Sequence, residues 1–147
     1  MKKSSLKWIG IFIGLLLLVT ACGQDTPTPA PASSPTEPIK IAVLGPLTGP
    51  SGFLGQGGLQ GATMAMEEIN KKGGLLGRQV EIVSYDTEAK PDVAKLVAER
   101  AILVDKVVAI TGVIMSEVSV ALADVAAEHH VPLIISNSQT PKLNDIV

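Results

Sequence analysis

The chain has 147 residues, a formal net charge of −2 and an aromatic content of only 3%. No basic stripe interleaved with aromatic residues occurs in it, so a nucleic-acid partner is not expected. Its single cysteine, Cys22, excludes a disulfide within the chain.

The first 21 residues have the pattern of a secretory signal. Basic residues precede an apolar run over residues 8–19, which is shorter than the ~20 residues of a membrane-spanning helix. The run ends in the sequence VTAC, which resembles the bacterial lipoprotein box. Residues 1–21 are therefore predicted to be a lipoprotein signal peptide, and Cys22 the lipidated first residue of the mature chain. An ordinary signal peptide with an incidental thiol is the alternative.

The composition changes abruptly after Cys22. Residues 23–38 alternate proline with Thr, Ala and Ser, a composition that favours an extended polyproline II chain of ~3.1 Å per residue. Residues 22–38 are therefore predicted to be a tether between the bilayer and a folded domain. This organisation places the domain on the extracytoplasmic face of a bacterial cell membrane.

Residues 39–147 are expected to form one small α/β domain with its own core. Short apolar runs predict strands at residues 39–44, 80–85, 107–110 and 133–135. Apolar residues at helical spacing predict helices over residues 59–72, 91–104 and 116–130. This alternation predicts a mostly parallel sheet with helices on both faces.

Three connections are expected to meet at the carboxyl edge of this sheet, where ligands of such folds bind. Residues 45–58 are predicted to be a flexible, glycine-rich lip beside a cleft. Ser116 is expected at the N-cap of the third helix, where free N–H groups and the helix dipole suit a small anion. A plain capping role for Ser116 is the alternative. Residues 136–140 add five hydrogen-bonding side chains, so a polar pocket for a carboxylate or zwitterionic ligand is predicted.

Nucleotide-binding motifs are incomplete in the first connection. It contains no lysine for a Walker loop, and Gln60 stands where a dinucleotide fingerprint needs its third glycine. Asp86, at the end of the second strand, is the acid that a Rossmann enzyme would use for a ribose. The incomplete fingerprint makes that reading a minor alternative.

No catalytic or metal-binding constellation is evident. Ser116 lacks the flanking glycines of a hydrolase nucleophile. His129 and His130, expected in the last helical turn, are adjacent and cannot both face one metal. The acid pairs Glu67–Glu68 and Asp86–Glu88 are interpreted as solvated surface. Neither a cofactor, nor a metal, nor an enzymatic activity is expected.

Several motifs occur together in a recognisable order: GPLTG from Gly45, the run G-x-x-x-A-x-x-x-I-N-x-x-G-G-x-x-G ending at Gly77, D-x-x-x-x-P from Asp86, and VPLIIS ending at Ser136. With these motifs, residues 39–143 resemble the leucine/isoleucine/valine-binding protein family. Its members are substrate-binding lipoproteins or periplasmic proteins of ABC importers. The resemblance implies the first lobe of a type I periplasmic binding protein and permease subunits as membrane partners.

The resemblance also implies a site. In this family a two-lobed clamp closes on an amino acid or a related small polar solute. Ser116 matches the serine that holds the α-carboxylate, and Ser138 and Thr140 match groups that hold the carboxylate and the α-amino group. Leu54 lies where several members place an aromatic cover over the ligand side chain. With Phe53 beside it, this position implies an apolar cover for an aliphatic amino acid.

Family members continue well beyond the position of Val147 and build a second lobe. Residues 39–147 are therefore expected to be a partial N-terminal lobe that binds weakly if at all in isolation. The full-length relative is expected to bind aliphatic amino acids. A lipid-anchored sensory domain of the same fold and a Rossmann nucleotide-binding enzyme are the alternatives.

Overall fold

The computed structural model describes residues 37–145. The predicted signal peptide, Cys22 and all but the end of the predicted tether lie outside the described residues. In chain order the described part forms β1 (Ile39–Gly45), α2 (Gly52–Lys71), β2 (Val80–Asp86), α3 (Pro91–Leu103), β3 (Ala109–Val113), α4 (Ser116–Glu128), β4 (Leu133–Ile135) and a short 3-10 helix, η1 (Pro141–Asp145).

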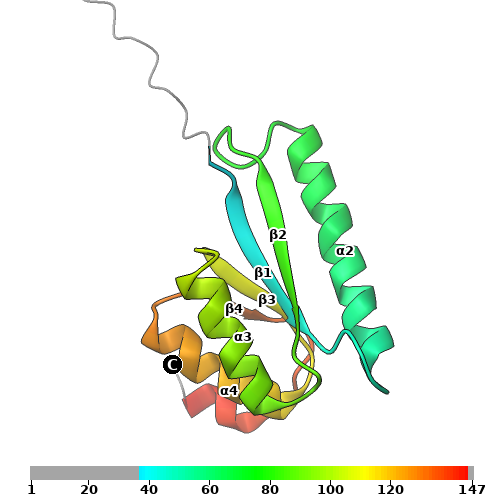
Figure 1. Ribbon diagram of the computed structural model, residues 1–147, viewed down its shortest axis with the longest axis vertical. Coiled ribbons are helices and arrows are strands. Elements are labelled where there is room, and N and C mark those ends of the chain that lie inside the picture. The colour runs from blue at the N-terminus through cyan, green and yellow to red at the C-terminus, as the bar shows by residue number, and fades with distance from the viewer. Residues whose placement is uncertain (1–36, 146–147) are drawn as a thin grey trace, which may run out of the picture. The chain divides into compact units, whose positions relative to one another are not determined.

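The four strands form one sheet in the order β2-β1-β3-β4, and every neighbouring pair is parallel. Helix α2 covers one face, whereas α3 and α4 pack on the other (Figure 1). The predicted α/β class, with a parallel sheet between helices, is confirmed. Because the chain adds β2 on one side of β1 and β3 on the other, the strand order reverses between β1 and β3, which is where such sheets bind ligands.

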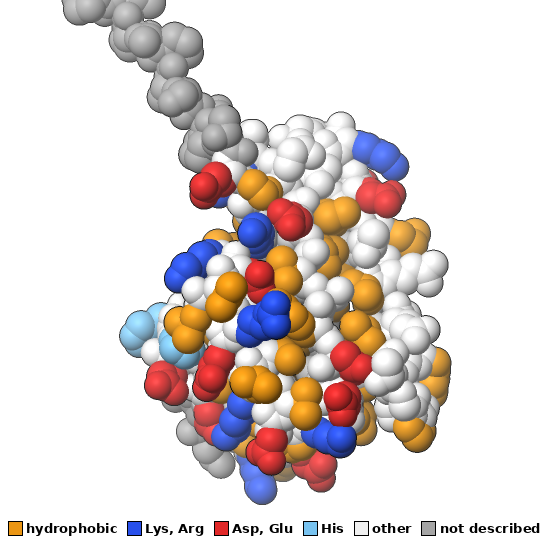
Figure 2. Space-filling model, viewed as in Figure 1, with side chains coloured by type: hydrophobic (Ala, Val, Ile, Leu, Met, Phe, Trp, Pro, Cys, Tyr) orange, Lys and Arg blue, Asp and Glu red, His pale blue; other side chains and the backbone are white. Residues whose placement is uncertain are grey.

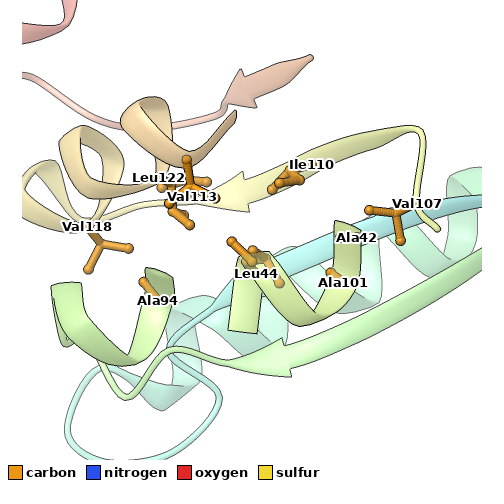
Figure 3. Close-up of a cluster of buried hydrophobic side chains, with 11 residues drawn as sticks. Ala42, Leu44, Ala94, Ala101, Val107, Ile110, Val113, Val118 and Leu122 are labelled. Carbon is orange, nitrogen blue, oxygen red and sulfur yellow. The ribbon is translucent and has the colours of Figure 1, made fainter. Parts of the chain in front are cut away.

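The core lies between the sheet and the α3–α4 face (Figure 3). Large side chains from three elements fill it, including Leu44 of β1, Ile110 of β3 and Leu122 of α4, all fully buried. The fully buried positions of helix α3 are all alanines, Ala94, Ala98 and Ala101, so the helix can approach the sheet closely, and its larger Val97 and Ile102 pack partly buried against the same core. Its outer side is a mixture of apolar and charged side chains (Figure 2), and Leu96 is 67% exposed there.

Helix α2 begins seven residues earlier than predicted, at Gly52 instead of Leu59. The predicted flexible loop of residues 45–58 is therefore wrong, and only residues 46–51 form a connection, here called the 46–51 turn. The early start depends on close packing. A Cβ added to Gly55 would lie 1.9 Å from the carbonyl oxygen of Pro46. Glycine serves here to bring two backbones together, and the helix gains in packing what glycine costs in propensity.

Strand β3 is also displaced from its prediction, residues 107–110. It begins at Ala109 and runs through Gly112 to Val113. Gly112 has a φ of +89°, and the β3–β4 register shifts between Ile110 and Val113. The left-handed φ of Gly112 is compatible with glycine and strained for other residues.

The I-N-x-x-G-G motif has a direct structural reason. Asn70 Nδ2 donates to the carbonyl of Val80 at 2.8 Å, and the Val80 N–H donates to Asn70 Oδ1 at 2.7 Å. Gly74, with a φ of +80°, passes so close to Arg78 that a Cβ would lie 1.9 Å from its carbonyl oxygen. The predicted glycine stop is confirmed, and the asparagine joins the end of α2 to the start of β2.

Replacing Asn70 with aspartate is expected to lower the free energy of unfolding by about 1–3 kcal/mol, because a carboxylate oxygen would then face the Val80 carbonyl without a proton between them. Urea denaturation measures the change. Glu67→Gln is the control, since Glu67 makes only an exposed contact of 3.9 Å with Lys71 and such pairs contribute little. Equal stability of the Asn70→Asp variant and the wild type would contradict this role.

Candidate functional site

The carboxyl ends of β1, β3 and β4 and the starts of α2 and α4 lie at one edge of the sheet, here called the rim (Figure 1). Between β1 and β3, where the strand order reverses (the switch point of the sheet), the backbones of the two strands are in close contact with each other and with α2. A Cβ added to Gly45 would lie 3.2 Å from the carbonyl oxygen of Gly112 and 3.5 Å from the Cα of Gly55. The three connections predicted to meet do leave the sheet at this edge.

Ser116 is the first residue of α4, and Met115 occupies the N-cap in an extended conformation. The predicted N-cap position of Ser116 is therefore wrong by one residue, and no side chain caps this helix by a hydrogen bond. Without a capping bond, the hydroxyl of Ser116 remains near the loop after β4. Its Oγ accepts two contacts of 3.4 Å, from Ser138 Oγ and from the N–H of Gln139.

The first turn of α4 presents backbone donors to this point. The first contact back to Met115 is made by Ser119, whose N–H and hydroxyl donate to the Met115 carbonyl at 2.8 and 2.9 Å. The N–H groups of residues 116–118 precede that bond and have no partner within the helix by its geometry. Together with the helix dipole, they form a donor set suited to a carboxylate.

The loop after β4 is held against the end of β3. Ser136 Oγ and the N–H of Asn137 both donate to the Val113 carbonyl, at 3.3 and 3.4 Å. Further along this loop, the half-buried Ser138 lies against Ser116, so the structure brings these two predicted residues together. Thr140 is half-buried directly before η1, and its carbonyl accepts a 3.4 Å hydrogen bond from the N–H of Leu143. Among residues 37–145, no hydrogen bond joins Thr140 to Ser116 or Ser138.

Phe53 and Leu54 lie in the first turn of α2, at the same edge of the sheet. Phe53 is 72% exposed and Leu54 is 41% exposed. Two large, exposed apolar side chains at the edge that also carries the polar donor set form a candidate cover for an apolar group. Their contact with a ligand stays a prediction.

Asp86 organises the rim in a way that the sequence interpretation missed. Its Oδ1 accepts the N–H groups of Leu47 and Glu88, each at 2.8 Å, and its Oδ2 accepts the hydroxyl of Thr48. Partial burial opposes ionisation, but the hydrogen bonds from Thr48, Glu88 and Leu47 outweigh it and lower the pKa of Asp86. Asp86 is thus a structural acceptor, and its assignment to solvated surface is wrong. The local sequence carries no signal for this role, because only the parallel pairing of β1 and β2 sets Gly45 opposite Asp86.

The sequence pattern described as periplasmic binding protein matches residues 38–145. The chain belongs to this family.

Characterised relatives of this periplasmic binding protein include two amino-acid-binding proteins. The leucine-, isoleucine-, valine-, threonine- and alanine-binding protein of Pseudomonas aeruginosa is 35% identical over 111 residues, which are 76% of this chain and 30% of that protein. The Leu/Ile/Val-binding protein of Escherichia coli K12 is 31% identical over 107 residues, 73% of this chain and 29% of that protein. The chain thus spans about 30% of the length of these relatives.

Solved structures of similar proteins show the same fold. The branched-chain amino acid transporter substrate-binding protein LivJ of Streptococcus pneumoniae, in complex with isoleucine, aligns with a TM-score of 0.71 at 29% identity over 74% of this chain and 31% of that chain. The leucine-binding protein LivK of Thermotoga maritima aligns with a TM-score of 0.65 at 38% identity over 71% of this chain and 29% of that chain.

The two histidines of this binding protein lie just beyond α4. Helix α4 ends at Glu128, so His129 is its C-cap and His130 follows with a φ of +55°. Their predicted place inside the last helical turn is wrong.

Within residues 37–145, no group of three or more His, Cys, Asp or Glu side chains could hold a metal ion. Within the same range, no helix is long and apolar enough to cross a membrane.

Proposed function

We propose that this chain is part of the extracytoplasmic substrate-binding component of an ABC importer for amino acids, with branched-chain and other aliphatic amino acids as its substrates. The observation that carries the proposal is the meeting of Ser116, Ser138 and the free N–H groups of α4 at the switch point. Two relatives support it: the leucine-, isoleucine-, valine-, threonine- and alanine-binding protein of Pseudomonas aeruginosa, and LivJ of Streptococcus pneumoniae in its complex with isoleucine.

In this proposal the α-carboxylate of the ligand lies at the start of α4. The N–H groups of residues 116–118 and the hydroxyls of Ser116 and Ser138 donate to it. The two hydroxyls are 3.4 Å apart, longer than a well-formed O–H···O bond of about 2.7–2.8 Å. Each hydroxyl therefore loses little when it turns to the ligand. Thr140 approaches the α-amino group from the same loop.

The ligand side chain extends toward the first turn of α2. Phe53 and Leu54 are exposed there, and contact with an aliphatic group would remove apolar surface from water on both partners. Burying a valine or leucine side chain fully is worth about 1.5–3 kcal/mol. The apolar side chains of Phe53 and Leu54, together with the carboxylate donors at the start of α4, select an aliphatic amino acid. The proposed role is binding without catalysis.

The remaining parts of the proposal concern the whole protein. Cys22 is lipidated, residues 22–38 tether the domain to the cell membrane, and a second lobe closes on residues 39–147 when the solute binds. The closed form delivers its solute to permease subunits. The VTAC sequence supports the anchor, and the length of the relatives supports the second lobe.

Ser116→Ala is expected to weaken leucine binding by the two-lobed protein by about 1–3 kcal/mol, or roughly 5- to 150-fold, because one donor to a charged carboxylate is lost. Calorimetry with L-leucine measures the affinity. Thr63→Ala is the matched control, since its hydroxyl donates to Leu59 O within α2, and it should leave the affinity unchanged. Unchanged affinity of Ser116→Ala would remove the basis for the proposed site.

A further inference from the structure

We propose that Asp86 is a positioning residue for side-chain selectivity: it holds the 46–51 turn in place, so that the first turn of α2 presents Phe53 and Leu54 to the side chain of the bound amino acid. This inference rests on the proposed function. It concerns a residue that touches neither end of the ligand and acts through the turn alone.

The hydrogen bonds of Asp86 join two neighbouring strands at their ends. Asp86 is the last residue of β2 and pairs in register with Gly45, the last residue of β1. From this position its carboxylate accepts the N–H of Leu47 at 2.8 Å and the hydroxyl of Thr48. The N–H of Thr87 donates to the Gly45 carbonyl at 2.9 Å. The chain leaving β1 is therefore fixed from its first residues.

The other end of the turn is fixed from within α2. Gln56 Nε2 donates to the Leu47 carbonyl at 2.9 Å. Gly52 N donates to the Gly49 carbonyl at 3.0 Å, and Gly55 packs directly on Pro46. These contacts with residues 46–51 all come from α2 or from the turn itself, whereas the hydrogen bonds from Leu47 and Thr48 to Asp86 link the turn to β2. Asp86 thus fixes the position of the 46–51 turn relative to the sheet, and hence relative to the carboxylate donors at the start of α4.

The exposure of the apolar pair explains why such an anchor matters. Phe53 is 72% exposed, so its place at the rim is set by the backbone that carries it and only weakly by packing. A backbone that is already fixed lowers the ordering cost of binding. Loss of Asp86 would release this cover and leave the donors around Ser116 and Ser138 in place. The affinity should therefore fall mainly for ligands with a large side chain.

The test is calorimetry on the two-lobed protein with L-leucine and L-alanine as paired ligands. Asp86→Ala is expected to weaken leucine binding about tenfold and alanine binding less than about twofold, because the alanine methyl group contacts the cover little. Asp86→Ala should thus lower the ratio of the leucine affinity to the alanine affinity. Thr48→Val removes only the hydroxyl donor and should lower this ratio by a smaller factor. Glu88→Gln is the control. The side chain of Glu88 pairs with Lys90 at 2.7 Å in solvent, and this variant should leave both affinities unchanged.

Hydrogen exchange at the Leu47 amide gives a second readout, since its N–H donates to Asp86. Exchange should be faster in Asp86→Ala, with the core amides of β1 unchanged. Equal losses for leucine and alanine in both Asp86→Ala and Thr48→Val, or no loss for either ligand, would overturn the inference. If Asp86→Ala does not fold, Thr48→Val alone decides. A wild type that binds neither amino acid overturns the proposed function and this inference with it. A wild type that binds leucine, with an unchanged ratio in the variants, overturns this inference alone.

Discussion

Replacing Gly55 with alanine is expected to lower the free energy of unfolding by about 3 kcal/mol, near the upper end for overpacking. The added Cβ would lie 1.9 Å from the carbonyl oxygen of Pro46 and 2.6 Å from its carbonyl carbon. Both atoms belong to the backbone, so no side chain can rotate out of the way. The start of α2 must move off the end of β1, and the 46–51 turn must move with it.

Gly57→Ala is the matched control. It lies two residues later in the same helix, and an added Cβ would meet no atom within 4 Å. Because alanine is the better helix former by about 1 kcal/mol, this variant should be more stable than the wild type. Urea denaturation of both variants gives the comparison. A Gly55→Ala protein as stable as Gly57→Ala would show that α2 does not pack on Pro46 in solution.

Leu44→Ala is expected to cost about 3–5 kcal/mol, a large part of the stability of a domain of this size. Leu44 is fully buried in β1, a central strand, and belongs to the same core cluster as Ile110 and Leu122 (Figure 3). The fully buried positions of α3 in this cluster are alanines, whose short side chains cannot extend into the space left behind. The cavity therefore stays largely open, and that is the condition for a cost at the high end.

Leu96→Ala provides the contrast. It removes the same atoms from a side chain that is 67% exposed on α3, and its cost should stay within about 0.5 kcal/mol apart from helix propensity. Thermal and urea unfolding, followed by circular dichroism, measure both variants. Equal costs for Leu44→Ala and Leu96→Ala would contradict the described core.

The sequence was sufficient to predict the order of elements and the edge of the sheet at which Ser116 and Ser138 meet. Apolar β-branched runs gave the strands, and the carboxyl ends of parallel strands necessarily share an edge. This logic placed Ser116 and Ser138 near one another, and their oxygens lie 3.4 Å apart. The cap of α4 was misplaced by one residue because a serine at a helix start is favourable both as cap and as first helical residue.

Two features could not be predicted, for different reasons. The early start of α2 depends on glycines, which local propensity counts against a helix. Only the approach of Gly55 to Pro46 across the turn reverses that preference. The role of Asp86 depends on which backbone N–H groups face its carboxylate. Nothing in the local sequence separates such an aspartate from one in solvent, and only strand pairing brings Leu47 to it.

The seam between β1 and β3 constrains how this protein can change in evolution. Gly112 has a φ of +89°, and a Cβ there would lie 2.8 Å from Val43 Cγ1, while Gly45 faces Gly112 across the seam. A side chain at Gly112 would be strained by this φ, and one at Gly45 would press on the Gly112 carbonyl 3.2 Å away, so both positions resist substitution. Changes in the proposed solute preference must therefore arise at exposed positions around the proposed site, such as Phe53 and Leu54 at the start of α2 and the polar side chains in the loop after β4. Directed evolution toward another solute should randomise those exposed positions and leave Gly45, Gly55 and Gly112 untouched.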